Sequence, residues 1–160
     1  MARSPCTIIL PSPEDTAALA TRIGALLRPG DALLLSGGIG AGKTHFARAL
    51  IRSLQDMPED VPSPTFTLVQ VYDTAAGELW HTDLYRLSHA DEVIELGLLQ
   101  AFEEAICLVE WPDRLGDLAP ASALALSFAP GEEEETRRLS ISWQAGDWGE
   151  RLEEICHDNA

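Results

Sequence analysis

A glycine-rich segment constrains the fold of this chain more than any other feature of its sequence. Residues 37–44 read GGIGAGKT and fit the pattern G-x-x-x-x-G-K-[ST]. The short apolar run before it, residues 32–35, is typical of a strand buried on both faces, and residues 43–54 after it follow a helical pattern. With glycine at about 7% of residues, such a match arises by chance only about a few times in a thousand chains of this length. The segment therefore predicts a strand–loop–helix unit.

The residue types in this loop are those that hold phosphate groups in the P-loop class. Glycines let the backbone turn its N–H groups inward around phosphate oxygens. Lys43, the only lysine of the chain, is placed to reach the β- and γ-phosphates with its ammonium group. The hydroxyl of Thr44 is placed to coordinate Mg²⁺. We therefore expect a nucleotide and Mg²⁺ at this loop.

Adenine is the base that the sequence favours. A guanine-binding protein of this class carries an N-K-x-D segment, which cannot exist here because Lys43 and Asn159 are the only residues of their types. Residues 113–116 fit D-x-x-G, but that pattern is short and common. ATP and ADP are therefore the expected ligands, through the exclusion of guanine rather than through a positive adenine signal.

Composition and charge exclude several classes of protein. The 160 residues are 46% hydrophobic and 23% charged, which is ordinary for one globular domain over residues 1–160. The net charge of −15 opposes polyanions, so we expect no tRNA binding by the chain alone and no binding to an acidic membrane surface. The sequence contains neither a membrane-spanning apolar run nor a secretory signal. Three widely spaced cysteines, Cys6, Cys107 and Cys156, predict no disulfide and no zinc site, and fit a reducing cytoplasm.

The rest of the chain alternates predicted strands and helices. Ser12 is a predicted helix N-cap, with Pro13 at the first helical position and Pro29 at the stop. Further strands are expected at residues 67–72, 78–82, 105–109, 123–128 and 137–143, and further helices at 90–104 and over the last fifteen residues, with Trp148, Leu152 and Ile155 inward. Four glutamates at 132–135 indicate a solvated hairpin tip. This order predicts an α/β fold, a P-loop NTPase-like sheet with parallel core strands, an antiparallel part and helices on both faces.

Two carboxylates follow predicted strands, where a P-loop enzyme needs an acid to hold Mg²⁺ or to orient its waters. Glu110 ends the apolar run 106–109, and Asp83 follows the strand at 78–82. Thr65, in the segment SPTFT at 63–67, either meets the metal or γ-phosphate, as switch segments do, or belongs to a structured turn. His81 is interpreted as a hydrogen-bonded scaffold residue rather than a general base.

Four segments together resemble one known family. They are GGIGAGKT at 37–44, SPTFTLV at 63–69, HTDLYRL at 81–87 and LVEWP at 108–112. In kind, order and spacing they are similar to the TsaE (YjeE) family, small P-loop ATPases of bacterial tRNA threonylcarbamoyladenosine biosynthesis. The resemblance spans residues 12–114, and it departs from the family at Gly38, where Asp is usual, and at Thr82, where an aromatic residue is usual.

The resemblance implies a set of site residues. Lys43, Asp83 and Glu110 would act in hydrolysis, and Thr44, Asp83 and Glu110 would serve the metal. Residues that would contact the nucleotide are Pro13, Gly37, Gly38, Ile39, Gly40, Ala41, Gly42, Lys43, Thr44, His45, Thr65, Trp111 and Arg138. Arg137 stays open as the alternative to Arg138, because the register of the late hairpin is not set by the sequence.

The resemblance also implies how the chain acts. Its partners would be TsaD, which transfers the threonylcarbamoyl group to tRNA, and TsaB, and hydrolysis of ATP would reset or regulate the TsaB–TsaD complex in the cytoplasm. Two alternatives stay open at this point. One is a P-loop kinase that phosphorylates a small molecule, and the other is a nucleotide-binding switch with negligible turnover.

Overall fold

Two strands that each begin with a run of four apolar residues form the middle of the sheet. They are β2 (Ala32–Gly37) and β5 (Ile106–Glu110), which pair in parallel, and every residue of β5 is buried. The computed structural model describes residues 6–38, 42–55, 69–87, 89 and 91–158. Continuous apolar runs suit such positions because both faces of a central parallel strand are covered.

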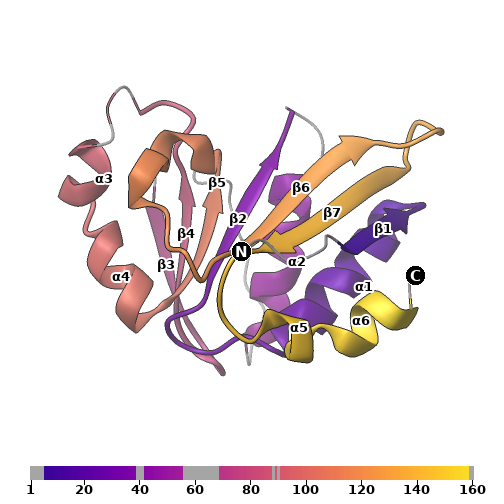
Figure 1. Cartoon of the computed structure of the whole chain (residues 1–160), viewed down its shortest axis with the longest axis horizontal. Coiled ribbons are helices and arrows are strands. Elements are labelled where there is room, and N and C mark those ends of the chain that lie inside the picture. Colours follow the sequence, from indigo (N-terminus) through magenta and orange to yellow (C-terminus); the bar gives the residue numbers. More distant parts are fainter. Residues whose placement is uncertain (1–5, 39–41, 56–68, 88, 90, 159–160) are drawn as a thin grey trace.

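Seven strands form one sheet in the order β1-β7-β6-β2-β5-β4-β3 (Figure 1). The other strands are β1 (Cys6–Leu10), β3 (Val69–Thr74), β4 (Gly77–Asp83), β6 (Leu124–Pro130) and β7 (Arg137–Trp143). The neighbours β6, β2, β5 and β4 are parallel, whereas β1, β7 and β3 pair antiparallel at the two ends. The predicted fold class, with parallel core strands and an antiparallel part, is confirmed.

Helices cover both faces of this sheet, as Figure 1 shows. One face packs against α1 (Pro13–Gly24), α2 (Lys43–Leu54), α5 (Trp148–Arg151) and α6 (Glu153–Asp158). The other packs against α3 (Asp91–Glu95), α4 (Leu98–Glu104) and the 3₁₀ segment η1 (Pro112–Leu118). Residues of β5 alternate between the two cores, with Leu108 in the first and Cys107 and Val109 in the second.

Helix α1 begins as the sequence predicts. Ser12 is the N-cap, its side chain accepts a hydrogen bond from the Asp15 amide, and its hydroxyl donates to the Asp15 carboxylate at 2.7 Å. Pro13 occupies the first helical position. The helix ends at Gly24, before the Pro29 stop that the sequence suggests. Inward placement of Trp148, Leu152 and Ile155 is confirmed, since all three are buried.

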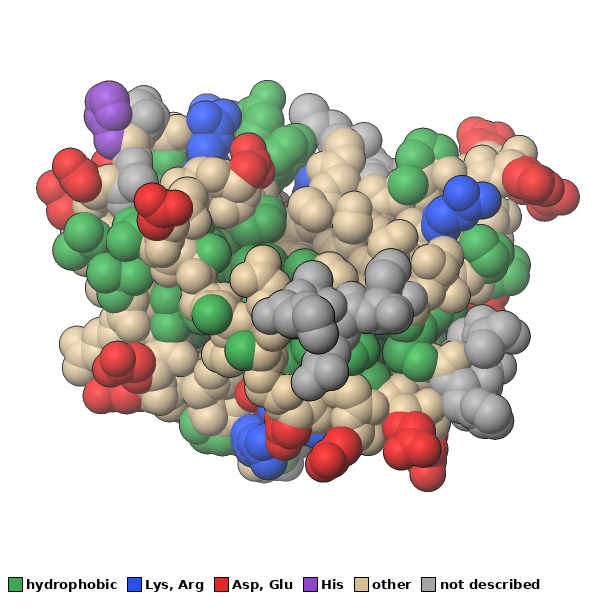
Figure 2. Space-filling model, viewed as in Figure 1, with side chains coloured by type: hydrophobic (Ala, Val, Ile, Leu, Met, Phe, Trp, Pro, Cys, Tyr) green, Lys and Arg blue, Asp and Glu red, His purple; other side chains and the backbone are tan. Residues whose placement is uncertain are grey.

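Two predicted helices are each divided. Residues 90–104 contain α3 and α4, separated at Gly97, whose φ of 80° ends the first helix in the left-handed region. The C-terminal residues likewise form α5 and α6 rather than one helix. The four glutamates at 132–135 are exposed at the β6–β7 hairpin tip, the acidic group at the upper right of Figure 2, as predicted.

The expectation that the cysteines form no disulfide is wrong. Cys6 of β1 and Cys156 of α6 are bonded, with Cα atoms 5.9 Å apart, and Cys107 alone is free and buried. The pair is separated by 150 residues of sequence, and only the packing of α6 against β1 brings the two thiols together. Sequence spacing therefore carried no signal of this pair.

No helix in the described part of the chain has the length and apolar character needed to cross a membrane.

Candidate functional site

The glycine-rich loop leaves the carboxyl end of β2 and enters α2. Gly37 has a φ of 140° and Gly42 a φ of 109°, backbone conformations that residues other than glycine rarely adopt. Gly42 is the N-cap of α2, and its carbonyl accepts from the Phe46 amide at 2.9 Å. The predicted phosphate contacts Ile39, Gly40 and Ala41 lie outside the described residues.

Lys43 lies at the first position of α2 with its side chain turned into the loop. It is only 5% exposed, and its Nζ donates to the carbonyl oxygens of Gly37 at 2.5 Å and Gly38 at 3.3 Å. The ammonium also lies 3.8 Å from the centroid of the Trp111 ring, a cation–π contact. Burial lowers the pKa of Lys43, while nearby carboxylates, Glu110 first, act in the opposite direction. The loop thus encloses one partly desolvated cation.

Glu110 at the end of β5 links this loop to the neighbouring strand. Its Oε1 accepts from the Thr44 hydroxyl at 2.7 Å, and its Oε2 lies 2.7 Å from His81 Nε2. Burial of Glu110 would raise its pKa, but the hydrogen bond and charge of His81, the hydroxyl of Thr44 and the ammonium of Lys43 outweigh burial. The pKa is therefore lowered, and the group is a carboxylate.

Asp83 lies at the end of β4, directly across from Glu110 in the parallel register. It is 5% exposed, and its Oδ1 accepts from the Tyr85 amide at 2.9 Å. The carboxyl ends of parallel strands meet at one edge of the sheet, so the two acids predicted from separate segments are cross-strand neighbours. Lys43, Thr44, Asp83 and Glu110 are thus brought together at one site.

Trp111 lies beside this site in an unusual backbone conformation. Its φ of 60° and ψ of 55° are left-handed, the single case among non-glycine residues in the described ranges. The Trp111 amide donates to the Leu35 carbonyl at 3.2 Å, and its ring is 4.8 Å from that of Tyr85. Such a conformation costs free energy and tends to be kept where a side chain must be aimed. Sequence reasoning included Tyr85 in the segment HTDLYRL at 81–87 but did not single it out as a site residue.

A pocket of about 380 Å³ opens beside the start of α2. It is lined by Pro13, Thr16, Gly42, His45, Glu134, Glu135 and Arg137. His45 Nε2 lies 2.9 Å from the Pro13 carbonyl oxygen and so joins α2 to the start of α1. Arg138 is exposed and lies on the other face of β7, so Arg137 is the arginine placed at this pocket. Thr65 lies outside the described residues.

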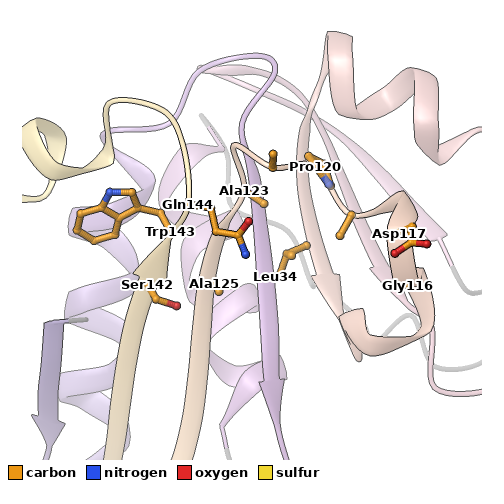
Figure 3. A pocket seen from close by; sticks show the side chains of 11 residues that line it. Leu34, Gly116, Asp117, Pro120, Ala123, Ala125, Ser142, Trp143 and Gln144 are labelled. Carbon is orange, nitrogen blue, oxygen red and sulfur yellow. The ribbon is translucent and has the colours of Figure 1, made fainter. Parts of the chain in front are cut away.

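A second pocket, of about 450 Å³, lies on the opposite face of the sheet (Figure 3). Leu34, Ala125 and Ser142 line it from β2, β6 and β7, and Asp117 and Pro120 line it from η1 and the loop that follows. None of the predicted site residues is among its eleven lining residues.

In this chain a parallel strand leads into a glycine-rich loop and then a helix. A buried lysine and a hydroxyl at the helix start, with an acid from the neighbouring strand of the sheet, place the protein in the P-loop class. A family model for the threonylcarbamoyl adenosine biosynthesis protein TsaE matches residues 10–139 of this chain. The chain therefore belongs to the TsaE family, which takes part in tRNA threonylcarbamoyladenosine biosynthesis.

Curated relatives and a solved structure agree with this membership. The chain is 35% identical over 154 residues to the TsaE protein of Bacillus subtilis (strain 168), with 92% of each chain covered. It is 44% identical over 108 residues to that of Aquifex aeolicus (strain VF5), covering 67% of this chain and 77% of the relative. The crystal structure of Bacillus subtilis YdiB matches with a TM-score of 0.79 at 28% identity, covering 99% of each chain.

Proposed function

We propose that the chain binds ATP and ADP with Mg²⁺ at the loop of residues 37–44 and hydrolyses ATP there. The observation that carries this proposal is the chain of contacts from the loop to β5. Lys43 is buried against the loop carbonyls, and the next residue, Thr44, donates to the Glu110 carboxylate at 2.7 Å. A cation for phosphates and a hydroxyl–carboxylate pair for a metal therefore stand side by side at a helix N-terminus.

The residues present suit Mg²⁺. This ion prefers oxygen ligands and is usually held by one or two carboxylates together with substrate phosphates and waters, so a cage of several acids is not needed. Thr44 and Glu110 would hold the ion. Asp83, which is 5% exposed and lies at the end of the neighbouring strand β4, would bind the ion or its waters. When bound, Mg²⁺ supplies charge neutralisation on the phosphate oxygens. Lys43 adds a second positive charge, and Trp111 covers that ammonium from the side.

The pocket beside α2 is the place for the base in this proposal. Pro13, Thr16 and His45 line it next to the helix start, and Arg137 lines it from β7. The His45 contact to the Pro13 carbonyl, at 2.9 Å, holds the start of α1 against α2. These contacts support a nucleotide that spans from the loop toward α1.

The hydrolysis serves tRNA modification through protein partners, on this proposal. Members of the TsaE family take part in tRNA threonylcarbamoyladenosine biosynthesis, and a net charge of −15 disfavours direct contact with tRNA. We therefore assign the chain an accessory role, in which its ATPase cycle resets or regulates a TsaB–TsaD complex. It performs no chemistry on the modified base itself.

The test counts threonylcarbamoyladenosine formed per TsaD over several turnovers in a mixture of TsaB, TsaD and tRNA. Wild type should sustain repeated turnover, whereas Lys43→Ala, Glu110→Gln and omission of the chain should not. Glu103→Gln, an exposed glutamate on α4, is the matched control and should behave as wild type. Equal yields in every mixture would exclude the accessory role. ADP formation that depends on an added metabolite, with the γ-phosphate transferred to that metabolite and no free phosphate released, would favour the kinase alternative.

A further inference from the structure

His81 is buried completely, although it carries a polar ring. It lies on β4, where Leu79, His81 and Asp83 share the face that packs toward α2, and its exposed fraction is 0%. The parallel register puts His81 across from Leu108, two residues before Glu110 on β5. A leucine would satisfy this apolar position equally well by size and burial. The imidazole therefore calls for a reason other than packing.

The reason lies in how Glu110 is held. Thr44 occupies Oε1 and His81 occupies Oε2, each at 2.7 Å, so the carboxylate is fixed at both oxygens. An ionised carboxylate only accepts hydrogen bonds, so the His81 Nε2 carries the proton and donates it. His81 Nδ1 is buried without a hydrogen-bond partner among the described residues. Leaving a buried polar atom unpaired costs free energy, so the ring is retained for its contact to Glu110.

We propose that His81 is a positioning residue for the metal site, its Nε2–H holding one oxygen of Glu110 so that the other stays directed at Thr44. This inference rests on the proposed function, because it assigns Glu110 to Mg²⁺. Without His81 the carboxylate is free to rotate away from Thr44 and loses its preorganised geometry. Hydrogen-bond partners of metal ligands typically change metal affinity or activity by about 10- to 100-fold.

The experiment separates the metal from the nucleotide. ADP binding is measured by calorimetry in EDTA and then across a Mg²⁺ titration for wild type, His81→Leu and His81→Gln. His81→Leu should raise the Mg²⁺ concentration that gives half of the Mg²⁺-dependent change in ADP affinity by about 10- to 100-fold. Its ADP affinity in EDTA should be unchanged. His81→Gln retains an N–H donor and should recover most of the Mg²⁺ response. His89→Leu, at an exposed histidine, is the control and should match wild type.

A second readout does not involve nucleotide or metal. Long-range ¹H–¹⁵N spectra of the histidine rings should show Nε2 of His81 protonated, and Glu110→Gln should shift that signal while leaving the His89 ring unaffected. A His81→Leu protein with the wild-type Mg²⁺ response would overturn the positioning role. So would a His81→Leu protein whose ADP affinity falls equally in EDTA and in Mg²⁺. An unprotonated Nε2 would overturn it even if His81→Leu fails to fold. Wild type without any Mg²⁺-dependent ADP binding would overturn the proposed function as well.

Discussion

Breaking the bond between Cys6 and Cys156 should destabilise the chain more than any single hydrogen bond in the site. The bond closes a loop whose ends are 150 residues apart in sequence. In the chain-entropy description, a loop of that length stabilises the folded state by about 5 kcal/mol at 25 °C, and measured values of about 2–4 kcal/mol are typical. For a chain of this size each kcal/mol shifts Tm by about 2–4 °C. We expect Cys156→Ala to lower Tm by about 10 °C.

Guanidinium chloride unfolding with and without dithiothreitol measures this stabilisation. Reductant should lower the wild-type midpoint to that of Cys6→Ala or Cys156→Ala, and it should leave the midpoint of either variant unchanged. The double variant should lie near the single ones, because the bond is lost only once. A peptide map made without reductant should contain the Cys6–Cys156 peptide. Variants that unfold at the wild-type midpoint, or a reductant-independent wild type, would refute the reasoning.

Five further outcomes are expected. Lys43→Ala should weaken ADP binding by about 10- to 100-fold in calorimetry, because a charge-assisted contact of about 1.5–3 kcal/mol is lost; equal wild-type affinities for GTP and ATP would contradict the adenine assignment. Burial raises the pKa of Cys107 to about 12, so its thiol should resist iodoacetamide at pH 8 until the chain unfolds, as mass spectrometry would show. Since the unfolded thiol loses its proton near pH 9 and the folded one does not, stability should fall as pH rises from 9 toward 12, more steeply than in Cys107→Ala. Ser12→Ala should cost about 1 kcal/mol in urea unfolding and Ser12→Asp much less, because only the former removes the cap of α1. At physiological salt the chain alone should not retain tRNA on a filter, since its net charge is −15; retention would contradict the charge argument.

Local features of the chain could be predicted from sequence because neighbouring residues determine them. The Ser12 cap depends on side chains within one turn of the helix. The start of α2 depends on a glycine, because glycine readily adopts the positive φ found there. The apolar run before Glu110 predicted a buried strand with an acid at its end, and the structure has that arrangement. Asp83 was predicted only to follow a strand, and the parallel pairing of β4 with β5 is what places it across from Glu110.

Contacts between distant segments were decided by the tertiary structure alone. The pairing of His81 with Glu110 requires the register of β4 on β5, and that register follows from the burial of whole strands rather than from either segment. The bond between Cys6 and Cys156 requires β1 and α6, which lie at opposite ends of the sequence, to pack against each other. The face that Arg137 presents follows from its pairing with β1 and β6, since a shift of one residue would exchange it with Arg138. Sequence determined which chemical groups the chain carries and where α1 and α2 begin, whereas long-range burial determined which groups meet.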